Sequence, residues 1–190
     1  MASVAAALIA LLGIIIAGFL STIVAEDYRR FRDGSGLAAA LAGELASYML
    51  AAEIMLPIMD GLQRATVATG GVSLPPVELH MQPDPAFDAG VGNLGLLGTE
   101  LAEDTAFVYQ QLRAFRSTYK LLSTPNLQLG PTQTLAILAG WKGTLDRAQT
   151  RGKPLVLSLK SRANQPYVAP WPLSWLQRLP RAPNRQGEAD

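Results

Sequence analysis

Residues 2–25 read ASVAAALIALLGIIIAGFLSTIVA and carry no charged side chain; their only polar members are Ser3, Ser21 and Thr22. About 20 helical residues cross the hydrocarbon core of a bilayer, so this run is long enough to span it. A cleaved signal peptide is the alternative. However, no Lys or Arg precedes the run, its apolar stretch is longer than that of a signal peptide, and it ends in a poor cleavage site. We therefore predict an uncleaved transmembrane anchor over residues 1–27.

Basic and aromatic residues follow the run directly: Tyr28, Arg29, Arg30, Phe31 and Arg32. Because basic residues concentrate on the cytoplasmic side of membranes, and none precedes the run, we expect a single-pass protein with a cytoplasmic C-terminal body. Aromatic rings and snorkelling arginines are typical of the membrane–water interface, so all five residues are assigned to it. Three arginines fall short of a polybasic lipid-binding cluster, which has about 4–8 basic residues.

Small residues interrupt the run at Gly13 and Ala17, four positions apart, with Gly18 beside them. This spacing lets two membrane helices approach closely. Gly13, Ala17 and Gly18 are therefore candidate contacts with another membrane protein or with a second copy of the chain. Since small residues are common in any span, an ordinary lipid-facing role is the alternative.

The body shows helical periodicity after a predicted break at residues 33–36, which read DGSG. Apolar residues recur at spacings of three and four over 37–65, 96–123 and 132–150, which predicts amphipathic helices. Matched apolar stripes favour packing of these helices against one another. The predicted fold class is all-α, with one N-terminal transmembrane helix followed by a two- to three-helix bundle.

Local signals set the expected details of these helices. Pro57 should kink the first helix because it leaves a carbonyl without its helical donor. Thr99 should cap the second helix, since a threonine hydroxyl can accept a hydrogen bond from the first turn. Gly152 and Pro154 should end the third helix and lead into a short extended segment at 154–159.

Two regions are rich in turn-forming residues. Residues 66–95 contain Gly-Gly, Pro-Pro and Pro-Asp-Pro, which predicts a loop, with a short strand as a candidate at 77–81. Residues 153–190 should form an extended, partly disordered C-terminal tail that is irregular and rich in Pro. Its Trp171 and Trp175 are expected to dock on the body, on the bilayer interface or in a partner's groove. The domain prediction is thus an anchor at 1–27, a helical bundle at 28–152 and a tail at 153–190.

The composition excludes several function classes. The chain is 49% hydrophobic and 16% charged with a net charge of +1, which gives no support to nucleic-acid binding. It has no cysteine, which excludes disulfides, thiolate metal sites and cysteine nucleophiles. Its single histidine, His80, lies in the Pro-rich loop without neighbouring ligands and is interpreted as an ordinary loop residue. We predict no catalytic residue, no cofactor and no metal.

Two features have both a functional and a structural interpretation. Residues 90–95 spell GVGNLG but follow no convincing strand, so they do not predict a nucleotide site. Glu44 and Glu53 are the only charged residues over 37–59; in a second membrane span they would be functional, whereas in a soluble helix they point to solvent or pair with an arginine. We favour the soluble helix. Its methionines are interpreted as adaptable core packing: Met49, Met55 and Met59.

The order of the parts resembles uncharacterised bacterial single-pass proteins with small helical bodies. The resemblance covers residues 8–122 and includes GLLGTELA at 95–102 and FVYQQL at 107–112. It implies an architecture but no activity. The lack of cysteine, the Pro-rich tail and the high alanine content suit a bacterial cytoplasmic-membrane protein.

These observations favour attachment over catalysis. We expect a non-catalytic, membrane-anchored structural or accessory subunit that associates with a larger membrane protein or with itself. A small sensory or ligand-binding module that signals through its single transmembrane helix is the alternative.

Overall fold

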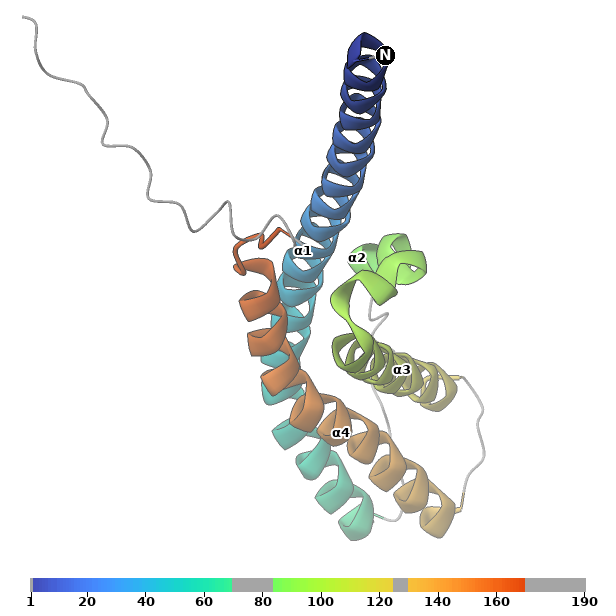
Figure 1. Ribbon diagram of the computed structural model, residues 1–190. Coiled ribbons are helices and arrows are strands. Elements are labelled where there is room, and N and C mark those ends of the chain that lie inside the picture. Colours follow the sequence, from blue (N-terminus) through green and yellow to red (C-terminus); the bar gives the residue numbers. More distant parts are fainter. Residues whose placement is uncertain (1, 70–83, 125–129, 170–190) are drawn as a thin grey trace, which may run out of the picture. The chain divides into compact units, whose positions relative to one another are not determined.

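The computed structural model describes residues 2–69, 84–124 and 130–169, and every regular element in these ranges is a helix (Figure 1). In chain order they are α1 (Ala2–Thr69), α2 (Pro85–Gly90), the 3₁₀ helix η1 (Val91–Leu97), α3 (Thr99–Leu122) and α4 (Pro131–Ala163). Side chains are described from Ala10 onward, except Leu12 and residues 15–17. The all-α prediction is confirmed, together with a long apolar helix at the N-terminus.

Two compact units divide the chain. The first consists of residues 1–32 and 166–190, and the second of residues 33–165. Helix α1 contributes residues to both units, whereas the other helices all belong to the second.

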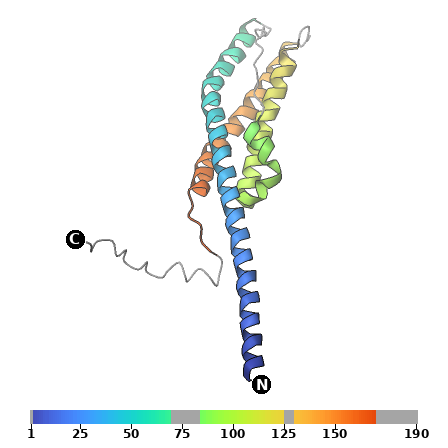
Figure 2. The same ribbon diagram turned by 90° about the horizontal axis from the view of Figure 1, so that it is seen from above.

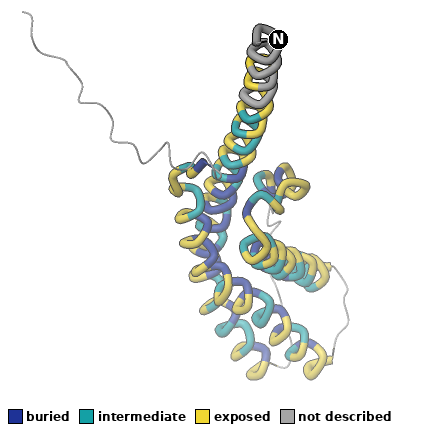
Figure 3. Tube along the Cα trace, viewed as in Figure 1, coloured by how far each residue is buried: buried dark blue, intermediate teal, exposed yellow. Residues whose placement is uncertain are grey.

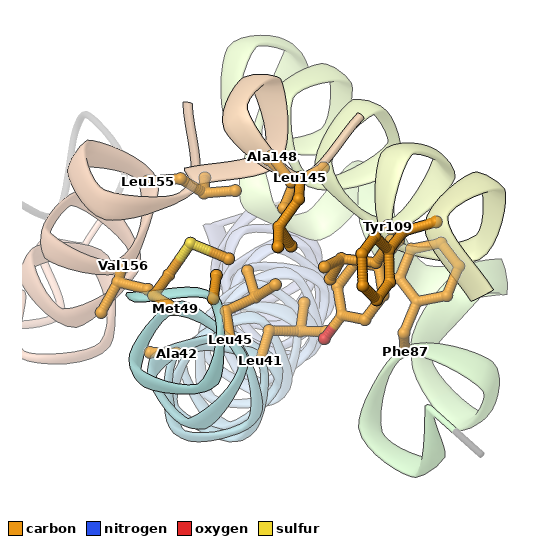
Figure 4. Packing of buried hydrophobic residues seen from close by; sticks show 14 of the residues in the cluster. Leu41, Ala42, Leu45, Met49, Phe87, Tyr109, Leu145, Ala148, Leu155 and Val156 are labelled. Carbon is orange, nitrogen blue, oxygen red and sulfur yellow. The ribbon is translucent and has the colours of Figure 1, made fainter. Parts of the chain in front are cut away.

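The second unit is held by one hydrophobic core to which each of its helices contributes (Figures 3 and 4). Helices α3 and α4 lie side by side in both ribbon views (Figures 1 and 2). In Figure 4, Leu45 and Met49 of α1 point toward Leu145 and Leu155 of α4. Tyr109 is fully buried beside them, at 0% exposure. Burying such side chains stabilises the fold by about 1.5–3 kcal/mol each before entropy is subtracted.

The predicted apolar stripes coincide with this core. On α3, the buried positions recur at helical spacing: Thr105, Val108, Leu112 and Phe115. On the second half of α1, Leu41, Leu45, Ala52 and Met59 are buried in the same way. The interpretation of the methionines as core packing agrees with Met49 and Met59, which are 5% and 1% exposed.

The predicted break at residues 33–36 is wrong, because α1 continues through it without interruption. Gly34 is buried, and a Cβ atom added there would lie 2.9 Å from the carbonyl oxygen of Leu96. The glycine therefore permits a close approach between α1 and η1. Glycine costs a helix about 1 kcal/mol relative to alanine, and the packing that it permits here offsets that cost.

The predicted end of the third helix is also wrong, because α4 passes through Gly152 and Pro154 and ends only at Ala163. A Cβ atom added at Gly152 would lie 2.4 Å from Sδ of Met49, so this glycine marks a close approach of α4 to α1. Leu155, Val156 and Leu159 are buried at helical spacing, so the segment expected to be extended is helical and part of the core. The tail predicted from residue 153 is accordingly helical at its start.

The connection before α3 differs from the prediction in two ways. Residues 85–97, expected to be part of a loop, form α2 and η1, and α1 extends to Thr69. Thr99 does not cap α3; the N-cap residue is Gly98, whose φ of 91° favours glycine, and no side chain caps this end. The strand candidate at 77–81 lies outside the described residues. Pro57, which was expected to kink the first helix, lies inside α1.

Candidate functional site

Asp84 is the one charged residue that is buried among the described residues. Asp84 precedes α2, and its side chain is only 2% exposed. It accepts hydrogen bonds from Arg116 at 2.5 Å, from Arg113 at 3.2 Å and from the hydroxyl of Tyr48 at 3.1 Å. We call these four residues the Asp84 junction. It joins the start of α2 to α1 and α3.

Electrostatics keeps the junction charged. Burial alone would raise the pKa of Asp84, but the hydrogen bonds and positive charges of Arg116 and Arg113 outweigh burial and lower it. Burial, together with the negative charge of Asp84, raises the pKa of Tyr48 to about 12. Tyr48 therefore stays protonated at neutral pH and can donate its hydrogen bond.

Cation–π contacts accompany the ion pairs. The guanidinium of Arg116 lies 5.2 Å from the ring centre of Tyr48, and that of Arg113 lies 5.0 Å from the ring centre of Phe87. Arg113 also pairs with Asp88 on the exposed side of α2. Each arginine therefore forms a cation–π contact with an aromatic ring and an ion pair with a carboxylate.

Glu44 forms a second polar link beside the junction. Its carboxylate accepts hydrogen bonds from the backbone N–H of Ala86 at 2.6 Å and from the hydroxyl of Tyr109 at 2.9 Å. Burial, and then the bond to Glu44, raises the pKa of Tyr109. Tyr109 also stacks on Phe87, with ring centres 4.1 Å apart. Glu44 thus holds the first turn of α2, a role that differs from pairing with an arginine or pointing to solvent.

Glu53, the other glutamate singled out from the sequence, pairs with Lys153 of α4 at 2.6 Å. Both side chains are about half exposed, at 50% and 52%. Asp60 pairs with Lys142 in the same manner, one from α1 and one from α4. These pairs lie at the surface, where each contributes little to stability.

Chemically, the carboxylates of Asp84 and Glu44 accept their hydrogen bonds from side chains of α1 and α3 and from the backbone N–H of Ala86. Among the described residues, no group of three or more His, Cys, Asp or Glu side chains could hold a metal ion. The arrangement fastens α2 to its neighbours. The sequence does not predict this role of Asp84, because Pro83-Asp84-Pro85 indicates only a turn. Arg113 and Arg116, three residues apart on α3, are the one hint of a buried anion partner.

The aromatic residues predicted for the membrane interface pack together in the first unit. The ring of Tyr167 lies 5.1 Å from that of Tyr28, edge to face, and 5.3 Å from that of Phe31. The hydroxyl of Tyr167 donates a hydrogen bond to Asp27 at 3.0 Å. Tyr167, which sequence reasoning passed over, therefore attaches the chain after α4 to the first part of α1.

The predicted interfacial arginines lie on the surface. Arg29 and Arg30 both pair with Glu26, at 2.6 Å and 3.0 Å, one turn earlier in α1. Arg32 is exposed. Pairs of this kind are typical of an exposed helix, and their assignment to a lipid interface stays a prediction.

Of the candidate partner contacts, Gly13 and Gly18 are exposed in α1, and a Cβ atom added at either would meet nothing within 4 Å. The carbonyl of Gly18 accepts hydrogen bonds from the hydroxyls of Ser21 and Thr22. Ala17 belongs to α1, but its side chain lies outside the described part. Trp171, Trp175 and His80 also lie outside the described residues.

The glycine-rich stretch 90–95 forms the end of α2 and most of η1. Gly90 is buried, and a Cβ atom there would lie 2.3 Å from Cδ1 of Leu37. The first glycine of GVGNLG is therefore explained by packing against α1.

One helix of the described chain is long and apolar enough to cross a membrane by length and composition, within Gly18–Thr69 of α1. A comparison of the chain with protein-family models, with curated proteins and with solved structures found no match. The resemblance to bacterial single-pass proteins thus gains no support from relatives.

Proposed function

We propose that this protein is a non-catalytic, membrane-anchored structural or accessory subunit of the bacterial cytoplasmic membrane. In this proposal residues 1–27 are the anchor, the helices of the second unit form a bundle-like cytoplasmic body, and the Pro- and Trp-containing tail follows it. The body associates with a larger membrane protein or with a second copy of the chain.

The observation that carries this proposal is an exposed apolar face on α1. Leu50, Ile54 and Ile58 recur every four residues and are 63%, 63% and 50% exposed among the described residues. Three large apolar side chains on one helix face are typical of a surface that another protein covers. The face adjoins the Glu53–Lys153 pair, which supplies a polar rim of the kind that surrounds interfaces.

Anchoring is supported by the uncharged run itself. The structure has it in helical form, and a helix satisfies every backbone hydrogen bond within the segment, as the bilayer requires. The Tyr28, Phe31 and Tyr167 rings gather just after the run, where aromatic side chains settle at a membrane surface.

The test is purification of the full chain in mild detergent, with its assembly state measured by light scattering and its composition by mass spectrometry. We expect a stoichiometric complex, either with a partner or with a second copy, and Leu50→Glu with Ile54→Glu should dissociate it. Leu157→Glu is the matched control, because Leu157 is an equally exposed leucine on α4, at 69%. A monomer without partner would overturn the proposal, and thermal stabilisation of that monomer by a small molecule would favour the sensory alternative.

A further inference from the structure

The first unit contains an apolar groove along α1. It is lined by residues of one face of the helix and by the ring that follows α4: Leu20, Ser21, Val24, Ala25, Tyr28 and Tyr167. Its volume is about 570 Å³, within the range of about 300–1,000 Å³ that small-molecule pockets occupy. A groove of this size is large enough for an aromatic side chain.

Tyr167 fixes where the C-terminal chain begins relative to this groove. Its hydroxyl is bonded to Asp27, and its ring packs edge to face on Tyr28. Two residues later, Ala169 is buried at 8% exposure. Tyr167 therefore forms part of the wall of the groove.

We propose that Trp171 occupies this groove. Trp171 follows Tyr167 by four positions, and four extended residues reach at most about 14 Å. Its indole can therefore reach the groove that Tyr167 lines. Pro170 and Pro172 flank it and restrict the backbone, which lowers the entropy lost on docking. The next tryptophan, Trp175, is four positions further away.

The chemistry of the groove suits an indole. Tyr28 and Tyr167 supply aromatic edges and faces, and Leu20 and Val24 supply aliphatic contacts. Ser21 donates its hydroxyl proton to the carbonyl of Gly18 at 2.8 Å, and its oxygen keeps lone pairs that can accept the indole N–H. Leu20, Ser21, Val24 and Ala25 also belong to the end of the proposed anchor, so Trp171 competes with lipid for the groove when that segment spans a membrane.

The absence of cysteine in this chain makes a thiol-protection experiment direct. A cysteine is placed in the groove by Val24→Cys, and the rate of its alkylation by a maleimide is measured on the full chain in detergent. If Trp171 covers the groove, adding Trp171→Ala should accelerate alkylation about tenfold, which corresponds to a docking free energy of about 1.4 kcal/mol.

Two control variants make the result decisive. Phe19→Cys places the thiol at a 67% exposed position that does not line the groove, and its alkylation rate should not respond to Trp171→Ala. Trp175→Ala should leave the rate at Val24→Cys unchanged. The proposal is overturned if Trp171→Ala leaves that rate unchanged, as it would if detergent or lipid filled the groove. An acceleration by Trp175→Ala alone would overturn it in favour of the second tryptophan.

Discussion

Asp84 shows how one residue can hold a short helix in place. Helix α2 spans only Pro85–Gly90, too short to be stable alone. Asp84, directly before it, forms ion pairs with Arg113 and Arg116 of α3 and accepts a hydrogen bond from Tyr48 of α1. Glu44 accepts a hydrogen bond from the backbone N–H of Ala86. The position of α2 therefore depends on buried polar bonds more than on its own helical tendency.

Replacing Asp84 with Asn should destabilise the second unit. The amide keeps the shape of the carboxylate but leaves Arg116, which is 21% exposed, without its buried countercharge. We expect the free energy of unfolding to fall by about 3 kcal/mol, measured by urea titration of the detergent-solubilised chain. Asp88→Asn is the control, because Asp88 is 54% exposed and its loss should cost less than about 1 kcal/mol. Equal effects of the two substitutions would contradict this role.

The lowered pKa of Asp84 also predicts a pH dependence. Because the folded state holds this carboxylate ionised, the unfolded state binds more protons at acidic pH. The stabilisation is present above the unfolded pKa of about 3.9 and is lost as the pH falls through the lower folded pKa. Unfolding free energies measured from pH 6 to pH 3 should fall more steeply for the unsubstituted chain than for Asp84→Asn. Parallel curves would show that Asp84 does not titrate in this way.

At the scale of helices, Gly34 and Gly36 should respond in opposite directions to alanine. A Cβ atom added at Gly34 would lie 2.9 Å from the backbone oxygen of Leu96, whereas one added at Gly36 would meet none of the described atoms within 4 Å. Gly34→Ala should lower the free energy of unfolding by about 1–3 kcal/mol through overpacking. Gly36→Ala should raise it by up to about 1 kcal/mol through helix propensity. Urea titration of both variants checks this, and stabilisation by Gly34→Ala would indicate that η1 does not approach α1 there.

The periodic part of the fold could be predicted from the sequence because apolar spacing along a helix is local information. The α3 stripe from Thr105 to Phe115 is an example. The breaks were mispredicted at Gly34 and Gly152, because the cost of a glycine is local whereas the close approach that offsets it involves residues far along the chain. The Asp84 junction escaped prediction for the same reason, since Tyr48 and Arg116 come from α1 and α3 and meet Asp84 only in the folded unit.

At the scale of the whole molecule, membrane orientation is the prediction most open to test. Single cysteines at Ser3→Cys and at Ser158→Cys, an exposed position of α4, report the two sides. With a membrane-impermeant maleimide on intact bacterial spheroplasts, we expect labelling of the first and labelling of the second only after permeabilisation. The reverse pattern would invert the orientation, and protection of both before permeabilisation would exclude a spanning anchor.

The core of the second unit has a consequence for biosynthesis. Leu41, Leu45 and Met49 of α1 are buried against residues of α3 and α4, which leave the ribosome many tens of residues later. Because synthesis adds about 5–20 residues per second, these apolar side chains remain without their packing partners for on the order of several seconds. If the anchor inserts as proposed, residues 37–59 emerge beside the bilayer during that interval, and the charges of Glu44 and Glu53 would disfavour their entry as a second span.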